Sequence, residues 1–243
     1  MSAAAAVAEP QIAALVPAYN EEQTIGNVVT SAFSYGLSPV VVVDDGSSDQ
    51  TRKNALTAGA TVLSSPVNLG VGGALRIGFR YLARAEVPGA IQMDGDGQHL
   101  GSSIPAMRQA LSSGADLVIG SRFASSAGLE IGTVRRGAQR LLASMLSKSM
   151  GVPLHDVTSG YRAFSQRTIN LFGAHYPAEF LSDTVEALLL ARDAGLTVVE
   201  QQVEMCERVA GVASQSSIML PFVYARLMLV LGLHRFRPIE HGS

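Results

Sequence analysis

The sequence predicts an α/β fold in which helices cover both faces of a mostly parallel β-sheet. Apolar, β-rich runs alternate along the chain with stretches of helical periodicity, which is typical of parallel sheets. The four valines at 40–43 show no polar alternation, as expected for a strand buried on both faces. Strands are predicted over residues 11–19, 38–45, 60–65, 89–94, 115–122 and 196–205.

Helical patterns fill the gaps between these strands. They lie near residues 21–35, 49–58, 71–86, 103–113, 133–149 and 183–194. The 243 residues are enough for one large domain or two small ones, and they contain no internal repeat, low-complexity linker or block of charge. The stretch 124–132 is the best candidate for a mobile loop.

Composition narrows the classes of function. The net charge is −2 and the pI is about 6.2, which offers no electrostatic basis for binding nucleic acid. Cys206 is the single cysteine, so an intrachain disulfide is impossible and a reducing compartment is expected. The first ten residues contain no basic residue and do not follow the signal-peptide pattern, so we expect a loose tail there.

Unusual polar residues follow the predicted strands. They occupy 17–22, 44–49, 94–98 and 120–122. Ligands of open α/β sheets bind outside the carboxyl ends of the strands, so these residues should line one rim. The alternative is helix capping, because Asn20 with Gln23 and Ser47 with Gln50 fit capping boxes. Capping leaves the carboxylate pairs unexplained, and these repel each other unless a cation or a donor-rich ligand is present.

The segment Asp94-Gly95-Asp96-Gly97-Gln98 has the composition of a metal site. In an extended segment Asp94, Asp96 and Gln98 would share one face and present three oxygen donors. Oxygen donors suit Mg²⁺ or Mn²⁺. The alternative is a polar turn after a strand. EF-hand spacing, a Walker A sequence and a dinucleotide fingerprint are all absent.

Five ordered motifs resemble a known family. They are Pro17 to Glu22, Val43 to Asp49, Asn68 to Gly70, Met93 to His99 and Gly120 to Arg122. Together they resemble inverting family 2 glycosyltransferases of the GT-A fold, and Thr158 to Phe164 resembles the branch that makes dolichyl- or polyprenyl-phosphate sugars. The resemblance implies one GT-A domain over 1–243, with a nucleotide-sugar half at about 10–125, an acceptor half at about 126–215 and an apolar C-terminal helix and tail at 216–243.

The resemblance also implies a donor site and a metal site. Asp96 is the first choice as a ligand of Mg²⁺ or Mn²⁺, Gln98 is the second, and Asp94 matches a position that touches the ribose or the metal. Asp45, with Asp44 beside it, matches the position that recognises the base of a GDP- or UDP-sugar. The remaining donor-site residues implied are Pro17, Ala18, Tyr19, Glu21, Gly70 and Gly95. For Tyr19, packing at a strand end is the alternative.

Arginines are expected to bind the phosphates, since guanidinium groups suit phosphate oxygens. By resemblance Arg122 faces the donor diphosphate and Arg208 receives the acceptor phosphate, and we place Arg162 on the same rim. The alternative for each is a surface ion pair. Asp183 is the candidate general base if the acceptor is a hydroxyl, and its alternative role is to stabilise a helix N-terminus.

The acceptor implied by the resemblance is a lipid phosphate, but one motif departs from that branch. The branch has Arg, two residues, Gly, one residue, Ser and Lys, whereas this chain has an extra residue before Ser214 and Gln215 in place of Lys. A glycosyltransferase acting on a sugar or small-molecule hydroxyl, or a non-catalytic nucleotide-sugar-binding subunit, therefore remains an alternative.

The C-terminal region is apolar from Pro221 to Leu233 and then basic from His234 to Arg237. A helix of this length reaches about 20 Å, short of the roughly 30 Å hydrocarbon core. We predict an interfacial helix and a peripheral enzyme on the cytoplasmic face of a membrane. The alternative is a buried helix of a homo-oligomer.

Overall fold

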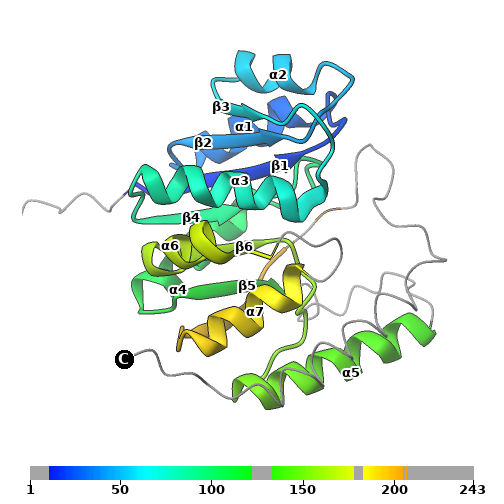
Figure 1. Cartoon of the computed structure of the whole chain (residues 1–243), viewed down its shortest axis with the longest axis vertical. Helices are drawn as coiled ribbons and strands as arrows, with labels where there is room; N and C mark the ends of the chain where they lie inside the picture. The colour runs from blue at the N-terminus through cyan, green and yellow to red at the C-terminus, as the bar shows by residue number, and fades with distance from the viewer. Residues whose placement is uncertain (1–10, 122–132, 178–182, 205, 207–243) are drawn as a thin grey trace, which may run out of the picture.

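The computed structural model describes residues 11–121, 133–177, 183–204 and 206, and it confirms the predicted α/β fold (Figure 1). The described strands are β1 (Ala13–Ala18), β2 (Val40–Asp44), β3 (Thr61–Ser64), β4 (Gly89–Gln92), β5 (Leu117–Ser121), β6 (Arg162–Ser165) and β7 (Val198–Gln202). They form one sheet in the order β3-β2-β1-β4-β6-β5-β7. Only β6 runs antiparallel to its neighbours β4 and β5 among these strands.

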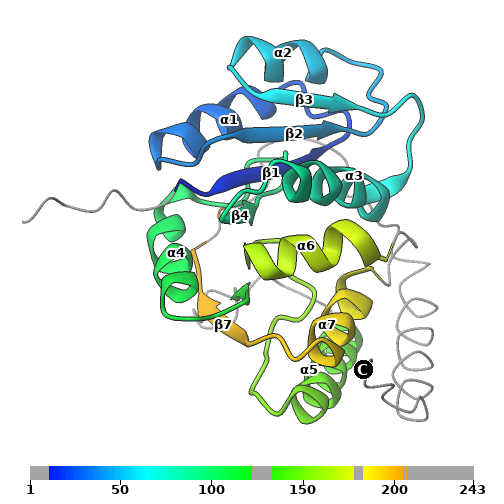
Figure 2. The ribbon, with the colours of Figure 1, turned by 60° about the vertical axis from the view of Figure 1, so that its left-hand side comes forward.

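Helices form a layer on each face of the sheet. They are α1 (Ile25–Ser34), α2 (Thr51–Thr57), α3 (Gly70–Arg84), α4 (Ile104–Ser112), α5 (Thr133–Met150), α6 (Gln166–His175) and α7 (Asp183–Asp193), with a 3-10 turn at Gly101–Ser103. Figure 2 separates the layers, with α1 and α4 on one side of the sheet and α3 and α6 on the other. The six predicted helices are therefore confirmed.

The pleat of the central strands explains why both faces are buried. Leu15, Val41 and Val43 join one hydrophobic cluster with α3, α5, α6 and α7. Val16 and Val42 point the other way and pack with α1, α2 and α4. All five side chains are fully buried, so the lack of polar alternation in the sequence reflects contact with helices on each side.

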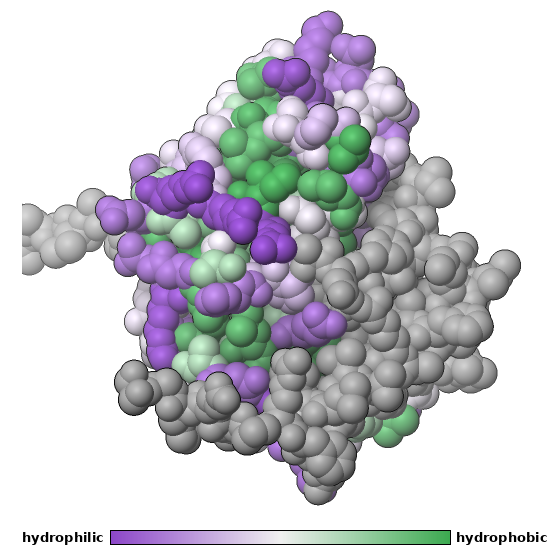
Figure 3. Space-filling view, viewed as in Figure 1, coloured by the Kyte–Doolittle hydropathy of each residue, from purple (hydrophilic) through white to green (hydrophobic). Residues whose placement is uncertain are grey.

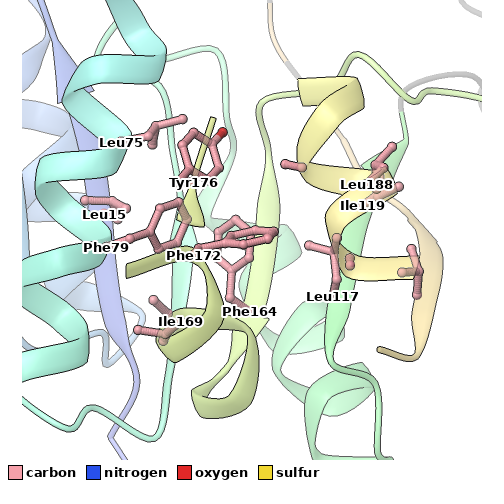
Figure 4. Packing of buried hydrophobic residues seen from close by; sticks show 14 of the residues in the cluster. Leu15, Leu75, Phe79, Leu117, Ile119, Phe164, Ile169, Phe172, Tyr176 and Leu188 are labelled. Atoms are coloured by element: carbon pink, nitrogen blue, oxygen red, sulfur yellow. The ribbon is translucent and has the colours of Figure 1, made fainter. Parts of the chain in front are cut away.

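The strand β6 and the helix α6 are absent from the predicted elements. β6 has only four residues, Arg-Ala-Phe-Ser, and carries no apolar run from which to predict it. Its position is secured by aromatic packing: the ring centroids of Phe79 on α3 lie 5.0 Å from Phe164 on β6 and 5.2 Å from Phe172 on α6. Tyr176 closes this cluster against Phe79 and Phe172 (Figure 4). Tertiary contacts therefore stabilise this insertion.

Two predicted features lie outside the described residues. They are the loop 124–132 and the apolar C-terminal segment from Pro221 to Leu233, and the departing motif with Ser214 and Gln215 lies outside the described residues as well. In the part of the chain that the structure describes, no helix combines the length and apolar character needed to cross a membrane.

Candidate active site

Strand register brings most of the polar loops to one edge of the sheet. Ala18 at the end of β1 lies opposite Asp44 at the end of β2. The end of β5 at Ser121 pairs with the end of β7 at Gln202, and these strands run in the same direction. The last residue of β4, Gln92, is followed by the 94–98 segment. The loops that the sequence analysis singled out therefore share a rim, as open α/β sheets require.

The loop after β1 is joined to the segment after β2 by hydrogen bonds between backbone amides and side chains. The Asn20 amide donates to Ser47 Oγ at 3.0 Å, and the Asn20 side-chain oxygen accepts from the Ser48 amide at 2.9 Å. The Glu21 amide donates to Thr51 Oγ1 at 2.7 Å. The polar residues of one loop thus satisfy the amides of the other, and the two loops behave as one rigid wall.

These bonds correct the capping alternative. Helix α1 begins at Ile25 after Thr24, and α2 begins at Thr51 after Gln50, with no side-chain capping bond at either start. Asn20 instead adopts a positive φ of 54°, which Asn tolerates better than most residues. Asn20 and Ser47 therefore hold loops together across the rim, and neither caps the helix that follows it.

The two aspartates at the end of β2 are buried and differently bound. Asp44 accepts a hydrogen bond from the Ser47 amide at 3.1 Å, within its own turn. Asp45 accepts from the Leu69 amide at 2.8 Å, immediately before α3 begins at Gly70. Burial raises the pKa of Asp45, while its bonds to the Leu69 and Gly70 amides lower the pKa in part and the charge of Asp44 raises it again.

The approach to α3 carries exposed apolar side chains beside these aspartates. Val67, Leu69 and Val71 are 58%, 48% and 44% exposed. Figure 3 shows apolar surface in the upper half of this face, over the part of the sheet that carries β1 to β3. Tyr19 is also 47% exposed, so it is not the packed aromatic of the alternative interpretation and is accessible to a ligand.

The segment 94–98 forms a turn, which corrects the expectation that it is extended. The turn covers residues 95–97, and Asp96 Oδ1 accepts from the Gln98 amide at 3.0 Å. Asp96 is only 2% exposed, whereas Asp94 and Gln98 are partly exposed. The polar-turn alternative is thus correct for the backbone, and the three oxygen-bearing side chains come from a turn and not from a strand pleat.

Two glycines let neighbouring groups approach this turn. A Cβ atom on Gly95 would lie 3.3 Å from Ala18 Cβ and from the Pro17 carbonyl oxygen, so the turn packs directly on the end of β1. The Thr24 hydroxyl donates to the Gly95 carbonyl at 2.7 Å. A Cβ atom on Gly160 would lie 3.0 Å from Asp94 Oδ1, so the Asp94 carboxylate rests against that glycine.

Arg162 lies at the rim, as predicted, but it is buried and its guanidinium binds backbone carbonyls. It starts β6 and is 3% exposed. Its guanidinium donates to the carbonyls of Ser159 at 2.9 Å, Val157 at 2.8 Å and Thr184 at 3.3 Å. Because β6 runs antiparallel, its first residue does lie at the rim opposite Gln92. The side chain, however, braces the 157–159 loop against the start of α7.

Three other predicted site residues lie wholly or partly outside the part of the chain that the structure describes. Arg122 and Arg208 lie outside the described residues, and so does the side chain of Asp183, which is the first residue of α7. Among the other predicted donor-site residues, Ala18 is buried and Pro17 and Glu21 are half-buried.

The sequence reasoning missed His99 and Tyr161. The Asp94 amide donates to His99 Nδ1 at 2.9 Å, and the His99 ring stacks on Tyr161 with centroids 4.5 Å apart. Both residues lie inside motifs that the sequence analysis singled out. His99 could have been identified because it stands in the same motif as Asp94, five residues later. The contact of Cys206 with the 94–98 segment was also missed: the Cys206 amide donates to the Gln98 carbonyl at 3.1 Å.

The candidate metal ligands fit a hard divalent cation. Asp94, Asp96 and Gln98 offer oxygen donors only, which Mg²⁺ and Mn²⁺ prefer. Within the described residues, no group of three or more His, Cys, Asp and Glu side chains is placed to hold a metal ion. Mg²⁺ is usually bound through one or two carboxylates together with substrate phosphates and water.

A cavity of about 620 Å³ lies beside the edge strand β7. Its described lining consists of Ser121, Val152, Pro153, His155, Val198, Val199, Glu200 and Gln202. The Glu200 carboxylate accepts hydrogen bonds from the His155 and Asp156 amides and from His155 Nδ1 at 2.7 Å. These bonds attach the loop that leads to residues 157–160 to the edge of the sheet.

In open, mostly parallel α/β sheets, ligands bind outside the carboxyl ends of the strands, and the carboxylate-bearing loops of this protein lie there. The chain matches the model of glycosyl transferase family 2 over residues 13–172, and it belongs to that family. It is therefore a glycosyltransferase, as the resemblance implied.

Several characterised relatives carry names that specify a lipid phosphate. The chain is 29% identical over 223 residues to polyprenol monophosphomannose synthase of Mycolicibacterium smegmatis, covering 83% of this chain and 80% of that one. It is 26% identical to UDP-N-acetylglucosamine–dolichyl-phosphate N-acetylglucosaminyltransferase of Methanococcus voltae, covering 93% and 98%. It is also 32% identical over 154 residues to glycosyltransferase AglJ of Haloferax volcanii, but it spans only 50% of that protein.

Solved structures share the fold. The structure of glucosyl-3-phosphoglycerate synthase from Mycobacterium tuberculosis with Mg²⁺ and UDP aligns with a TM-score of 0.69 and 22% identity. The alignment covers 95% of this chain and 81% of that one. The predicted GT-A architecture is thereby confirmed.

Proposed function

We propose that the protein is a metal-dependent, inverting glycosyltransferase that moves a sugar from a GDP- or UDP-sugar to a polyprenyl or dolichyl phosphate. The observation that carries this proposal is the placement of the Asp44–Asp45 pair and the Asp94–Asp96 turn on one rim of a family 2 fold. The acceptor is supported by relatives named for polyprenol and dolichyl phosphate that align over most of this chain.

The donor would lie along the rim from β2 to β4. Asp45 is held by the Leu69 amide and would accept hydrogen bonds from the base, as uracil and guanine both present N–H groups. Tyr19 is half exposed and would cover the base or ribose together with Pro17, Ala18, Glu21, Gly70 and Gly95. The wall formed by Asn20, Ser47 and Ser48 keeps this half of the site rigid.

The metal would be held by Asp96 and Asp94, with Gln98 as a further ligand. When bound, Mg²⁺ or Mn²⁺ neutralises charge that develops on the leaving diphosphate. Arg122 would add a guanidinium contact to the same diphosphate. We assign Arg162 a supporting role in place of a phosphate contact, because its donors face backbone carbonyls.

Chemistry at the acceptor follows from the ionisation of a phosphate monoester. Its second pKa is near 6, so at neutral pH it is mostly a dianion and needs no general base. A phosphate oxygen would attack the anomeric carbon as the bond to the donor diphosphate breaks, and the diphosphate leaves with the electron pair. Arg208 would hold the attacking phosphate. Inversion at the anomeric carbon follows from this single displacement.

An acceptor hydroxyl is the second candidate, supported by Gln215 in place of the Lys of the lipid-phosphate branch. A hydroxyl must lose its proton, and Asp183 at the start of α7 would act as the base. A donor panel of GDP- and UDP-sugars with polyprenyl phosphate separates the possibilities. Nucleotide release with a lipid-linked product supports the proposal. Turnover only when a sugar or small-molecule hydroxyl replaces polyprenyl phosphate supports the second candidate, and the absence of turnover with every donor and both kinds of acceptor points to a binding subunit.

Arg208→Ala tests the assignment of the acceptor phosphate. A charge-assisted contact to phosphate contributes about 1.5–3 kcal/mol, so kcat/KM for polyprenyl phosphate should fall roughly ten- to a hundredfold. Donor affinity, measured by calorimetry with the nucleoside diphosphate and Mn²⁺, should change little. Equal weakening of donor and acceptor would reject the assignment and favour a soluble hydroxyl acceptor. Arg140→Ala, at an exposed position on α5, is the control.

A further inference from the structure

We propose that His99 is a positioning residue that holds Asp94 in one orientation through both nitrogens of its ring. The proposal rests on the metal site of the proposed function, because Asp94 is one of its ligands. It concerns how that ligand is prepared before the cation arrives. Contacts of Asp94 and His99 with each other and with Tyr161 and Gly160 carry the argument, and all of these residues are described.

The first contact determines the tautomer of His99. The Asp94 backbone amide donates to Nδ1 at 2.9 Å. An amide N–H can only donate, so Nδ1 must present its lone pair and carries no proton. In the neutral ring the proton then resides on Nε2.

The second contact joins Nε2 to the side chain of the same residue. Nε2 lies 3.5 Å from Asp94 Oδ2, so the N–H of that tautomer is available to the carboxylate. One imidazole therefore contacts both the main chain and the carboxylate of Asp94. This pair of contacts restricts rotation of the Asp94 side chain, which is otherwise 38% exposed and free to sample several rotamers.

The remaining contacts immobilise the ring and the carboxylate. The His99 side chain is 1% exposed and stacks on Tyr161 with an interplanar angle of 8°. Tyr161 is fully buried, and its hydroxyl donates to the Leu100 carbonyl at 3.0 Å, which fixes the stacking partner. On the other side, Gly160 leaves room for Asp94 Oδ1. The Asp94 carboxylate is thus confined between His99 and Gly160.

A ligand oriented in this way binds a cation more tightly, because less rotational freedom is lost on binding. Outer partners of metal ligands generally contribute 10- to 100-fold to metal affinity. His99 and Tyr161 thereby link the 158–162 motif, which lies in the predicted acceptor half, to the metal turn of the donor half. The link would couple the arrangement of the two halves.

Nuclear magnetic resonance tests the tautomer on the unaltered protein. Two-bond ¹H–¹⁵N correlation of the imidazole groups should show His99 with a bare Nδ1 and a protonated Nε2 at neutral pH, without added metal. The His99 signal is identified by its absence in His99→Asn, among the five histidines of the chain. A proton on Nδ1 would overturn the proposal.

Titration of Mn²⁺ tests the consequence. His99→Asn places an amide oxygen near the Nδ1 position, so it can still accept from the Asp94 amide, but it has no group at the Nε2 position. In the presence of UDP or GDP, its affinity for Mn²⁺ should fall roughly 10- to 100-fold. The affinity for the nucleotide without metal should stay close to that of the parent.

Tyr161 and His175 provide matched variants. Tyr161→Leu removes the stacking partner and should also weaken Mn²⁺ binding, whereas His175→Asn, at an exposed position on α6, should not. Unchanged Mn²⁺ affinity in His99→Asn would overturn the positioning role. A parent protein that binds no Mn²⁺ with either nucleotide would overturn the proposed metal site as well, and the two failures are therefore distinguishable.

Discussion

Among the three predicted metal ligands, Asp96 is the most deeply buried, and it is the first choice from the sequence. It is 2% exposed, and its Oδ1 accepts from the Gln98 amide, which shapes the turn. A buried carboxylate is costly unless donors or a cation compensate it. The hydrogen bond from the Gln98 amide is one such compensation, and in the proposed function a bound cation would add another.

Asp96→Ala should abolish Mn²⁺-dependent binding of a nucleoside diphosphate while the fold remains intact. The Gln98 amide loses its acceptor, so the free energy of unfolding should drop by about 1–3 kcal/mol. Asp96→Asn is the matched control for the backbone bond, because its amide oxygen can still accept from Gln98 while the charge is gone. Calorimetry that finds parental Mn²⁺ binding in both variants would reject Asp96 as a ligand.

The raised pKa of Asp45 leads to a prediction about how the stability of the protein depends on pH. Burial raises its pKa above the 3.8 of an unperturbed Asp, so the folded protein prefers the protonated form. The stability linked to this group is fully present below the pKa of the unfolded chain and is lost as pH rises through the higher folded pKa. At neutral pH the charged Asp45 therefore costs folding free energy, which is typical of a residue retained for binding.

Asp45→Asn keeps an oxygen acceptor for the Leu69 amide and removes the charge. The variant should be more stable than the parent at neutral pH, and this difference should shrink as pH falls toward 3.8. Urea unfolding of both proteins at several pH values measures the difference. An advantage of the variant that grows toward acid pH has the opposite sign and would contradict the assignment.

At the scale of elements, the β6–α6 unit separates the two halves of the sheet and depends on one aromatic cluster. Phe172→Ala should remove its contacts with Phe79, Phe164 and Tyr176 and lower the free energy of unfolding by about 3–5 kcal/mol. Phe33→Ala on α1 is the control, because Phe33 is 39% exposed. Chemical denaturation measures the free energy of unfolding of both variants. Equal losses in the two would show that the aromatic cluster contributes no more than an exposed phenylalanine.

The loops after β1 and β2 show how elements prepare the site. Side chains of each segment accept hydrogen bonds from backbone amides of the other. The spacing of these residues in the sequence suggests only two separate capping boxes. Capping boxes are local patterns, whereas these bonds join residues 27 to 30 positions apart. The capping alternative therefore named Asn20 and Ser47 but not the partners that they have in the structure.

At the scale of the whole molecule, the proposal of a lipid acceptor requires contact with a membrane. Removing residues 218–243 should release the protein from vesicles that contain polyprenyl phosphate, because the apolar segment and the basic end are lost together. Sedimentation with vesicles measures the bound fraction. The full-length double variant Arg235→Ala with Arg237→Ala should lose only the part of the binding that depends on salt. Unchanged sedimentation of the truncated protein would reject the membrane role.

The sequence alone was enough to predict the layered architecture and the loops that line the rim at the carboxyl ends of the strands. Uninterrupted apolar strands such as 40–43 must be buried on both sides, and this requirement is local to each strand, so six strands and six helices could be predicted. The family motifs then identified the acidic loops. Only the tertiary structure decided the rest: the antiparallel insertion of β6, the turn at 95–97, the bracing role of Arg162 and the contacts of His99 with Asp94. Each of these depends on hydrogen bonds or ring packing whose partners are chosen by the folded geometry, and no periodicity along the chain encodes such a choice.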